Sequence, residues 1–169
     1  PKIIYIDQST GNEVTPNPDE EDKPVEEPIA LMTCEKNYGE EPVEGLENLV
    51  GRTQEMVVNY KGDAMTSIAL FDNYAFVDEA AAEAAQWYFD DLKATQEAMA
   101  TGLGLNLLSI KNERAGEMQE YSLGMNADEV VGDFIGTFML NTGEDGTALT
   151  DKGSVQAAYE ANGFSCTVE

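Results

Sequence analysis

The chain has 169 residues, 42% of them hydrophobic, which is sufficient for one globular domain with a packed core. Its 33 acidic and 9 basic residues leave a formal net charge of -24, which argues against nucleic acid and direct membrane binding and favours cations and basic partners. The absence of histidine excludes the Ser-His-Asp triad, the Cys-His dyad and most zinc chemistry, so we expect no enzyme.

Residues 1–28 are predicted to form an acidic tether. The apolar run at residues 2–6 is too short to cross a bilayer and could be a strand or the stub of an anchor. Residues 7–28 hold four prolines, eight acidic residues and one lysine, and this composition favours an extended, solvated chain. Because the chain begins at Pro1, we expect that an upstream targeting segment has been removed. The folded domain would then be residues 29–169.

The first part of this domain is predicted to be a strand followed by a β-hairpin. Residues 29–36 have the composition of a strand, and the Gly, Pro and Glu residues of 37–51 indicate a loop. Residues 54–60 and 64–71 would pair as a hairpin, since Gly62 can supply the positive φ of a tight turn. We expect alternate hairpin residues to share one face: Met56, Val58, Tyr60, Thr66, Ile68 and Leu70.

Residues 78–101 are predicted to form a long helix. Asp78 is a suitable N-cap, Glu79 lies in the first turn, and Gly102 follows the last turn. An apolar stripe repeats at spacings of three and four through Ala81, Ala85, Tyr88, Leu92 and Met99.

A second hairpin and a second helix are predicted to follow. Residues 105–111 and 117–125 have the pattern of two paired strands joined by a turn. Residues 126–140 open like a capping box, with Asn126 as the cap and Glu129 three residues later, which predicts a helix.

The chain ends in a Gly-rich acidic loop at 141–150, a short helix at 152–161 and a strand at 164–168. The two cysteines, Cys34 and Cys166, fall in strand-like segments that could pair side by side. They could form a disulfide or remain two unrelated buried thiols, and we expect the disulfide, which persists in an oxidising compartment. The elements together predict an α+β fold: an antiparallel sheet of about five strands, two or three helices on one face, and a disulfide joining the terminal strands.

Several segments carry a family resemblance. They are Thr33-Cys34, the hairpin NYKGDAMTSI, the Ala- and Glu-rich helix and the closing YEANGFSC at 159–166. With these features, residues 29–169 resemble the YehR-like small secreted lipoproteins of Gram-positive and related bacteria. The resemblance implies an extracellular domain anchored to the cell envelope, without established catalysis. Residues 125–151 have no counterpart in that group, and the chain lacks the group's lipid-bearing cysteine.

The loop at 141–151 is a candidate calcium site, because carboxylates and carbonyls are the ligands that calcium prefers. Its candidate ligands are Asn141, Glu144, Asp145 and Asp151. The loop lacks the alternating acidic spacing of an EF-hand, and acidic surface loops are ordinary in a chain this acidic. We therefore expect no cofactor, and calcium is the one alternative that the sequence offers.

Three consecutive aromatic residues in the first helix are candidate partner contacts: Trp87, Tyr88 and Phe89. Consecutive helical residues cannot all point into one core, so at least one must lie at its edge or outside. An exposed aromatic ring near Glu83, Asp90 and Asp91 would suit a basic partner, although the third ring could instead cover a sheet edge.

We therefore expect a non-enzymatic, membrane-tethered extracellular domain that binds a protein or another extracellular ligand. A calcium- or carbohydrate-binding module is the alternative. A secreted hydrolase that uses two carboxylates is less favoured, because such an enzyme needs an aromatic-lined cleft and the chain has one tryptophan.

Overall fold

The computed structural model describes Tyr5–Ile6, Glu13–Val14 and residues 26–169. Strands β1 (Tyr5–Ile6) and β2 (Glu13–Val14) pair as a short antiparallel ladder. The rest of the predicted tether, up to residue 25, lies outside the described residues. In the part that the structure describes, no helix is both long and apolar enough to cross a bilayer.

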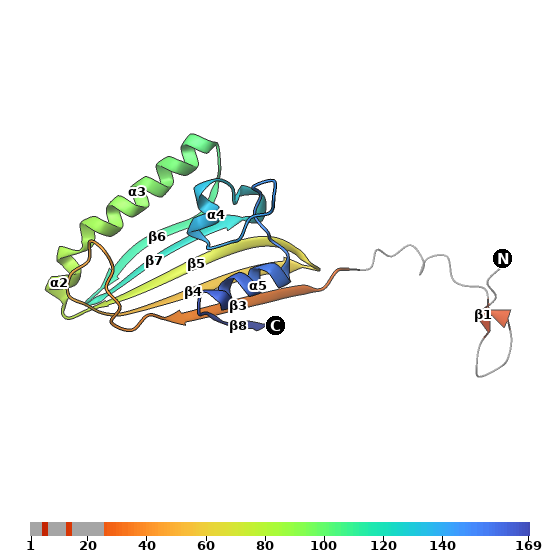
Figure 1. Cartoon of the computed structure of the whole chain (residues 1–169), viewed down its shortest axis with the longest axis horizontal. Coiled ribbons are helices and arrows are strands. Elements are labelled where there is room, and N and C mark those ends of the chain that lie inside the picture. Colours follow the sequence, from red (N-terminus) through yellow and green to blue (C-terminus); the bar gives the residue numbers. More distant parts are fainter. Residues whose placement is uncertain (1–4, 7–12, 15–25) are drawn as a thin grey trace.

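A six-stranded antiparallel sheet forms the body of the domain, and the helices lie on one of its faces (Figure 1). The predicted α+β fold is confirmed, and the sheet has six strands where about five were expected. The strand order is β6-β7-β5-β4-β3-β8. The strands are β3 (Ile29–Asn37), β4 (Leu49–Lys61), β5 (Ala64–Phe76), β6 (Leu107–Ala115), β7 (Met118–Asn126) and β8 (Ser165–Val168).

The helices divide the covered face of the sheet between them (Figure 1). Helices α2 (Glu79–Ala84) and α3 (Gln86–Leu103) contact the half that contains β5, β6 and β7, whereas α5 (Lys152–Ala161) contacts β8. The 3-10 helix η1 (Ala127–Glu129) and the short helix α4 (Asp133–Thr137) come between them in the chain.

The first predicted hairpin is confirmed and is longer than expected. Strands β4 and β5 have 13 residues each and are joined by a two-residue turn in which Gly62 has φ 60°. Five of the six residues expected on one face are buried beneath the helices, namely Met56, Val58, Tyr60, Ile68 and Leu70.

The expected position of Thr66 on this face is wrong. A register shift at Asn59 and Tyr60 pairs Tyr60 with Met65, so Met65 becomes the buried residue and Thr66 is exposed. The Thr66 hydroxyl donates to the carbonyl oxygen of Asn59 at 3.1 Å. The β-bulge therefore places Thr66 on the solvent side.

The first predicted helix forms, with one interruption. The Asp78 carboxylate accepts a hydrogen bond from the Ala81 amide at 2.8 Å, as expected of an N-cap. A single turn residue, Ala85, separates α2 from α3. Gly104 ends α3 in the left-handed conformation, with φ 68°.

The predicted helix over 126–140 is wrong. Asn126 makes no side-chain capping bond, and the chain forms η1, an irregular stretch and then α4. Gly132 has φ 58° and ψ -135°, a conformation outside the helical region that interrupts the segment. Phe134 and Phe138 are still fully buried, so the apolar pattern identified core residues although it did not specify a continuous helix.

Two hydrophobic clusters lie between the helices and the sheet. The first, under α4 and α5, includes Met56, Phe134 and Tyr159. The second, under α2 and α3, includes Phe76 and Phe89. Along β4 and β5 the clusters are separated by a polar group, which lies behind the candidate site.

Candidate binding site at Trp87

The candidate site lies where the loop of residues 43–48 folds against the junction of α2 and α3. Leu46 is buried in the second hydrophobic cluster, and its amide donates to the Val43 carbonyl at 3.0 Å. The Val77 amide donates to the Asn48 carbonyl at 2.9 Å, which ties the loop to the chain just before α2. Asn48 has φ 61°, a left-handed conformation that asparagine tolerates better than most residues.

The three consecutive aromatic residues have three different environments. Phe89 is fully buried, and its ring meets that of Tyr74 edge to face at a centroid distance of 4.9 Å. Tyr88 is half-buried beside Gly45, and its pKa is raised by burial. Trp87 is 61% exposed and contacts Tyr88 edge to face, with ring centroids 6.0 Å apart. Trp87 is therefore a large aromatic side chain held in solvent by two anchored neighbours.

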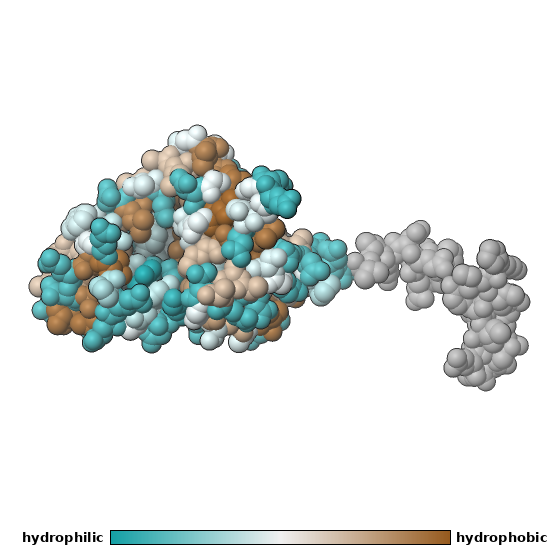
Figure 2. Space-filling view, in the orientation of Figure 1, coloured by the Kyte–Doolittle hydropathy of each residue, from teal (hydrophilic) through white to brown (hydrophobic). Residues whose placement is uncertain are grey.

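A pocket of about 390 Å³ lies beside the Trp87 ring. It is lined by three alanines of the helix junction, by four residues of the loop and by Trp87. Figure 2 shows hydrophobic residues among hydrophilic ones over this end of the domain, near α2. The lining residues are Gly45, Leu46, Glu47, Asn48, Ala81, Ala84, Ala85 and Trp87.

The surroundings of the pocket are acidic. Glu47 lines it and is exposed, and the Glu44 carboxylate is close enough to Tyr88 to raise the pKa of that phenol, after burial and Asp72. The carboxylate oxygen Oε1 of Glu83 lies 3.6 Å from Nη2 of Arg114, and the Glu83 side chain is exposed. Asp91 is exposed. Carboxylates therefore dominate the field around Trp87.

A buried polar cluster lies behind the site and separates the two hydrophobic clusters. Asp72 accepts two hydrogen bonds of 2.9 Å from the Arg52 guanidinium, one of 3.3 Å from Gln54 and one of 2.7 Å from the Tyr74 hydroxyl. The Tyr38 ring lies 4.4 Å from the guanidinium carbon of Arg52. Burial and then Asp72 raise the pKa of Tyr74. Because Asp72 accepts four hydrogen bonds, we assign this cluster a structural role.

The uncovered face of the sheet carries a second group of carboxylates. Glu35 on β3 and Glu55 on β4 are directly opposite one another. Burial and the hydrogen bond with Glu35 raise the pKa of Glu55. A shallow hollow of about 540 Å³ near this pair is also lined by Phe71, Asn73 and Glu120. Phe71 is only half-exposed, so this face presents no aromatic anchor comparable to Trp87.

Two of the candidate calcium ligands take part in hydrogen bonds within the chain. The Asp145 carboxylate accepts from the amide and hydroxyl of Thr147 at 3.1 and 2.7 Å, and these bonds lower its pKa. The Asp151 carboxylate accepts from the Ser154 amide at 3.0 Å and so caps α5. Asn141 and Glu144 are exposed. Within residues 26–169 and the two short strands, no three acidic or cysteine side chains are grouped as metal ligands would be.

Calcium binding by this loop stays a prediction. A calcium-specific rise in melting temperature, relative to sodium chloride of equal ionic strength, would support it.

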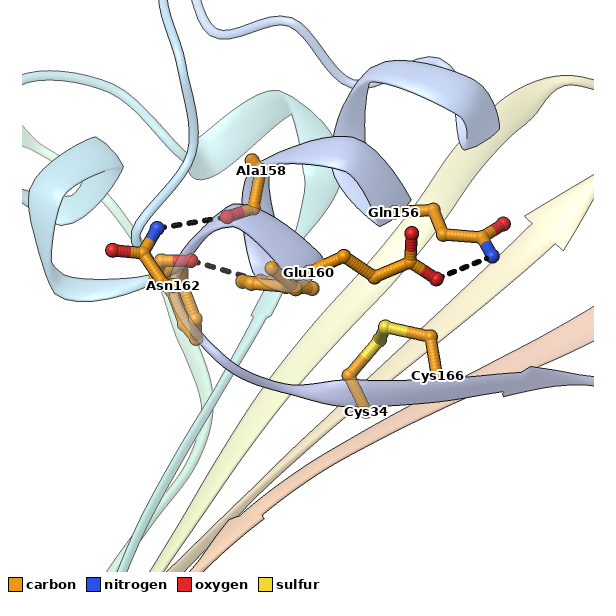
Figure 3. Close-up of a disulfide and its surroundings, with 8 residues drawn as sticks. Cys34, Gln156, Ala158, Glu160, Asn162 and Cys166 are labelled. Atoms are coloured by element: carbon orange, nitrogen blue, oxygen red, sulfur yellow. Dashed lines mark hydrogen bonds between the residues drawn. A yellow bond between two sulfur atoms is a disulfide. The ribbon is translucent and has the colours of Figure 1, made fainter. Parts of the chain in front are cut away.

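The disulfide joins the terminal strands of the domain. Cys34 on β3 and Cys166 on β8 form an S–S bond beneath α5, with their Cα atoms 4.1 Å apart (Figure 3). The predicted pairing is confirmed, and neither cysteine is free. The bond is consistent with an oxidising compartment such as the cell exterior.

No family model matches the chain, and no curated protein or solved structure matches it either. The resemblance to the YehR-like lipoproteins therefore stays a proposal.

Proposed function

We propose that this protein is a non-enzymatic, extracellular domain of the YehR-like lipoprotein type, tethered to the cell envelope, which binds a protein partner through the Trp87 site. The observation that carries the proposal is the 61% exposure of Trp87, which lines a pocket. Tryptophan is among the residues that contribute most binding energy at protein interfaces. Its indole offers a large apolar area together with an N–H donor.

Packed residues hold both sides of the site, which suits a binding surface. Phe89 and Tyr88 anchor the helix turn that carries Trp87, and Leu46 anchors the facing loop. A pre-organised surface loses less conformational entropy on association than a mobile one. The surrounding carboxylates would speed the approach of a positively charged partner.

Two further observations support an extracellular, tethered location. The disulfide between Cys34 and Cys166 favours an oxidising compartment. The Pro-rich acidic composition of residues 7–28 suits a spacer between an anchor and the domain.

Selection from a displayed peptide library tests partner binding. Peptides would be enriched on the immobilised wild-type protein and then measured against Trp87→Ala and Leu103→Ala. Leu103 is a matched control, because it is 52% exposed at the opposite end of α3. We expect selected peptides to bind wild type and Leu103→Ala equally and to lose at least tenfold in affinity for Trp87→Ala. Peptides that bind Trp87→Ala as well as wild type would refute the proposed surface.

A further inference from the structure

We infer that the pocket beside Trp87 binds the side chain of a lysine or arginine residue presented by the protein partner. This inference rests on the proposed function and adds the chemical class of the group that is recognised.

The pocket walls suit a long side chain with a methylene stem. Half of the pocket's lining residues are apolar residues other than Trp87: Leu46 and the three small residues Ala81, Ala84 and Ala85. Lysine and arginine bury their stems against such surfaces and keep the charged group toward water. The Trp87 ring supplies an aromatic face in the lining, where a cation gains about 0.5–1 kcal/mol at an exposed site.

The charge of the pocket selects a cation. Glu47 is the one charged residue among the lining residues, and Asn48 beside it offers an amide oxygen as a further acceptor. Glu44, next to the lining residue Gly45, adds a second exposed carboxylate. An anionic side chain entering this space would meet these carboxylates without a basic residue in the lining.

Two backbone donors at the break between the helices are already hydrogen-bonded within the chain. The Ala85 amide is directed at the carbonyls of Ala81 and Ala82, each at 3.2 Å. The Tyr88 amide donates to the Ala85 carbonyl at 3.0 Å. The Ala85 and Tyr88 amides therefore do not act as free donors for an anion, as the amides of a free helix N-terminus would.

Intrinsic fluorescence provides a direct test, because Trp87 is the single tryptophan of the chain. The probes are acetylated pentapeptides Gly-Gly-X-Gly-Gly in which X is lysine, arginine, norleucine or glutamate. Norleucine has the apolar stem of lysine without the charge, so it separates cation recognition from simple apolar contact. We expect a saturable change of Trp87 emission with the lysine and arginine peptides that weakens at high salt, and none with norleucine or glutamate.

Two glutamine variants make the test specific. Glu47→Gln should weaken lysine-peptide binding at least threefold, because it removes the charge in the pocket lining. Glu160→Gln is the control, since Glu160 is exposed on α5 over the other hydrophobic cluster, and it should bind like wild type.

Three outcomes would overturn the inference: equal binding of the norleucine peptide, no response to any basic peptide, or an unchanged affinity in Glu47→Gln. Library peptides that require Trp87 but contain no basic residue would overturn the lysine or arginine assignment and leave the proposed function standing. A saturable response of Trp87 emission to an oligosaccharide, with no response to the basic peptides, would overturn both this inference and the proposed protein-binding function.

Discussion

Asp72 is a buried carboxylate between two hydrophobic clusters. Its hydrogen-bond partners offset the cost of burying its charge. Its side chain is 7% exposed, and that of Arg52 is 19% exposed. We predict that Asp72→Asn lowers the free energy of unfolding by about 2–3 kcal/mol, because the guanidinium loses its counter-charge in a largely buried site. Urea denaturation at neutral pH measures the change.

Glu79→Gln is the matched control for this prediction. Glu79 pairs with Arg114 at 3.4 Å, but its side chain is 70% exposed. Exposed ion pairs contribute about 0–1 kcal/mol, so this variant should change stability by less than half as much as Asp72→Asn. Equal effects of the two variants would show that Asp72 is not held in a buried ionic cluster.

Glu55 introduces an unfavourable charge on the uncovered sheet face. Its pKa is raised by burial and by Glu35, so the folded protein binds its proton more tightly than the unfolded chain does. The free energy of unfolding therefore falls as pH rises through the folded pKa, and the full penalty applies above it. We predict that Glu55→Gln gains about 0.5 kcal/mol at pH 7.

The pH dependence separates this effect from a change of packing. Below the ordinary pKa of 4.5, wild type and Glu55→Gln both carry a neutral side chain at position 55. The gain in the free energy of unfolding should therefore disappear at such low pH. Glu40→Gln is the control, because Glu40 is exposed in a loop. A gain for Glu55→Gln that persists at low pH would contradict the proposed repulsion.

At the scale of secondary-structure elements, Gly132 explains why the segment after β7 is not one helix. Its φ of 58° and ψ of -135° are accessible to glycine and strained for other residues. We predict that Gly132→Ala lowers the free energy of unfolding by about 1–3 kcal/mol. Thermal and urea unfolding would measure the loss.

Gly136 is the matched control four residues later. It lies within α4, has no positive φ, and a β-carbon there would meet no atom within 4 Å. Gly136→Ala should therefore stabilise the protein by up to about 1 kcal/mol, because alanine favours the helix and restricts the unfolded chain. A loss of stability in both variants, or in neither, would contradict the assigned role of Gly132.

Local patterns predicted most of the strands, because alternation and turn chemistry act over a few residues. The disulfide could be predicted because both cysteines lie in such strand-like segments. Local patterns failed where distant contacts decide the structure. Strand β4 begins at Leu49, inside a predicted loop, because residues 49–51 pair with the end of β5. The outward rotation of Thr66 depends on a bulge that its residue type does not encode.

Only part of the candidate site could be predicted, because the rest depends on contacts between distant parts of the chain. The helical spacing of Trp87, Tyr88 and Phe89 showed that one ring must leave the core, and this is a local property. The pocket also needs the loop of residues 43–48, which is far from the helix in sequence. Gly45 is the sequence feature that best indicates this loop–helix contact, since a glycine in a loop lets the Tyr88 side chain approach the backbone closely.

At the scale of the whole molecule, the disulfide fixes the last strand of the domain to the first. Strand β8 has four residues at the edge of the sheet, and short edge strands pair weakly on their own. Beside the disulfide, Leu31 and Glu169 exchange two backbone hydrogen bonds of 3.0 and 2.8 Å. The Lys36 ammonium also donates to the Asn162 carbonyl at 2.8 Å, which holds the connection between α5 and β8.

We predict that this bond forms in the purified protein and contributes roughly 4 to 5 kcal/mol, since it closes a long loop of the unfolded chain. The two cysteines are 132 residues apart. Thiol titration of the denatured protein should find no free thiols without reductant and two after reduction. Reductant should lower the melting temperature of wild type to that of Cys34→Ala/Cys166→Ala and leave the double variant unchanged. Two free thiols in unreduced protein would contradict the pairing and remove the main support for an extracellular location.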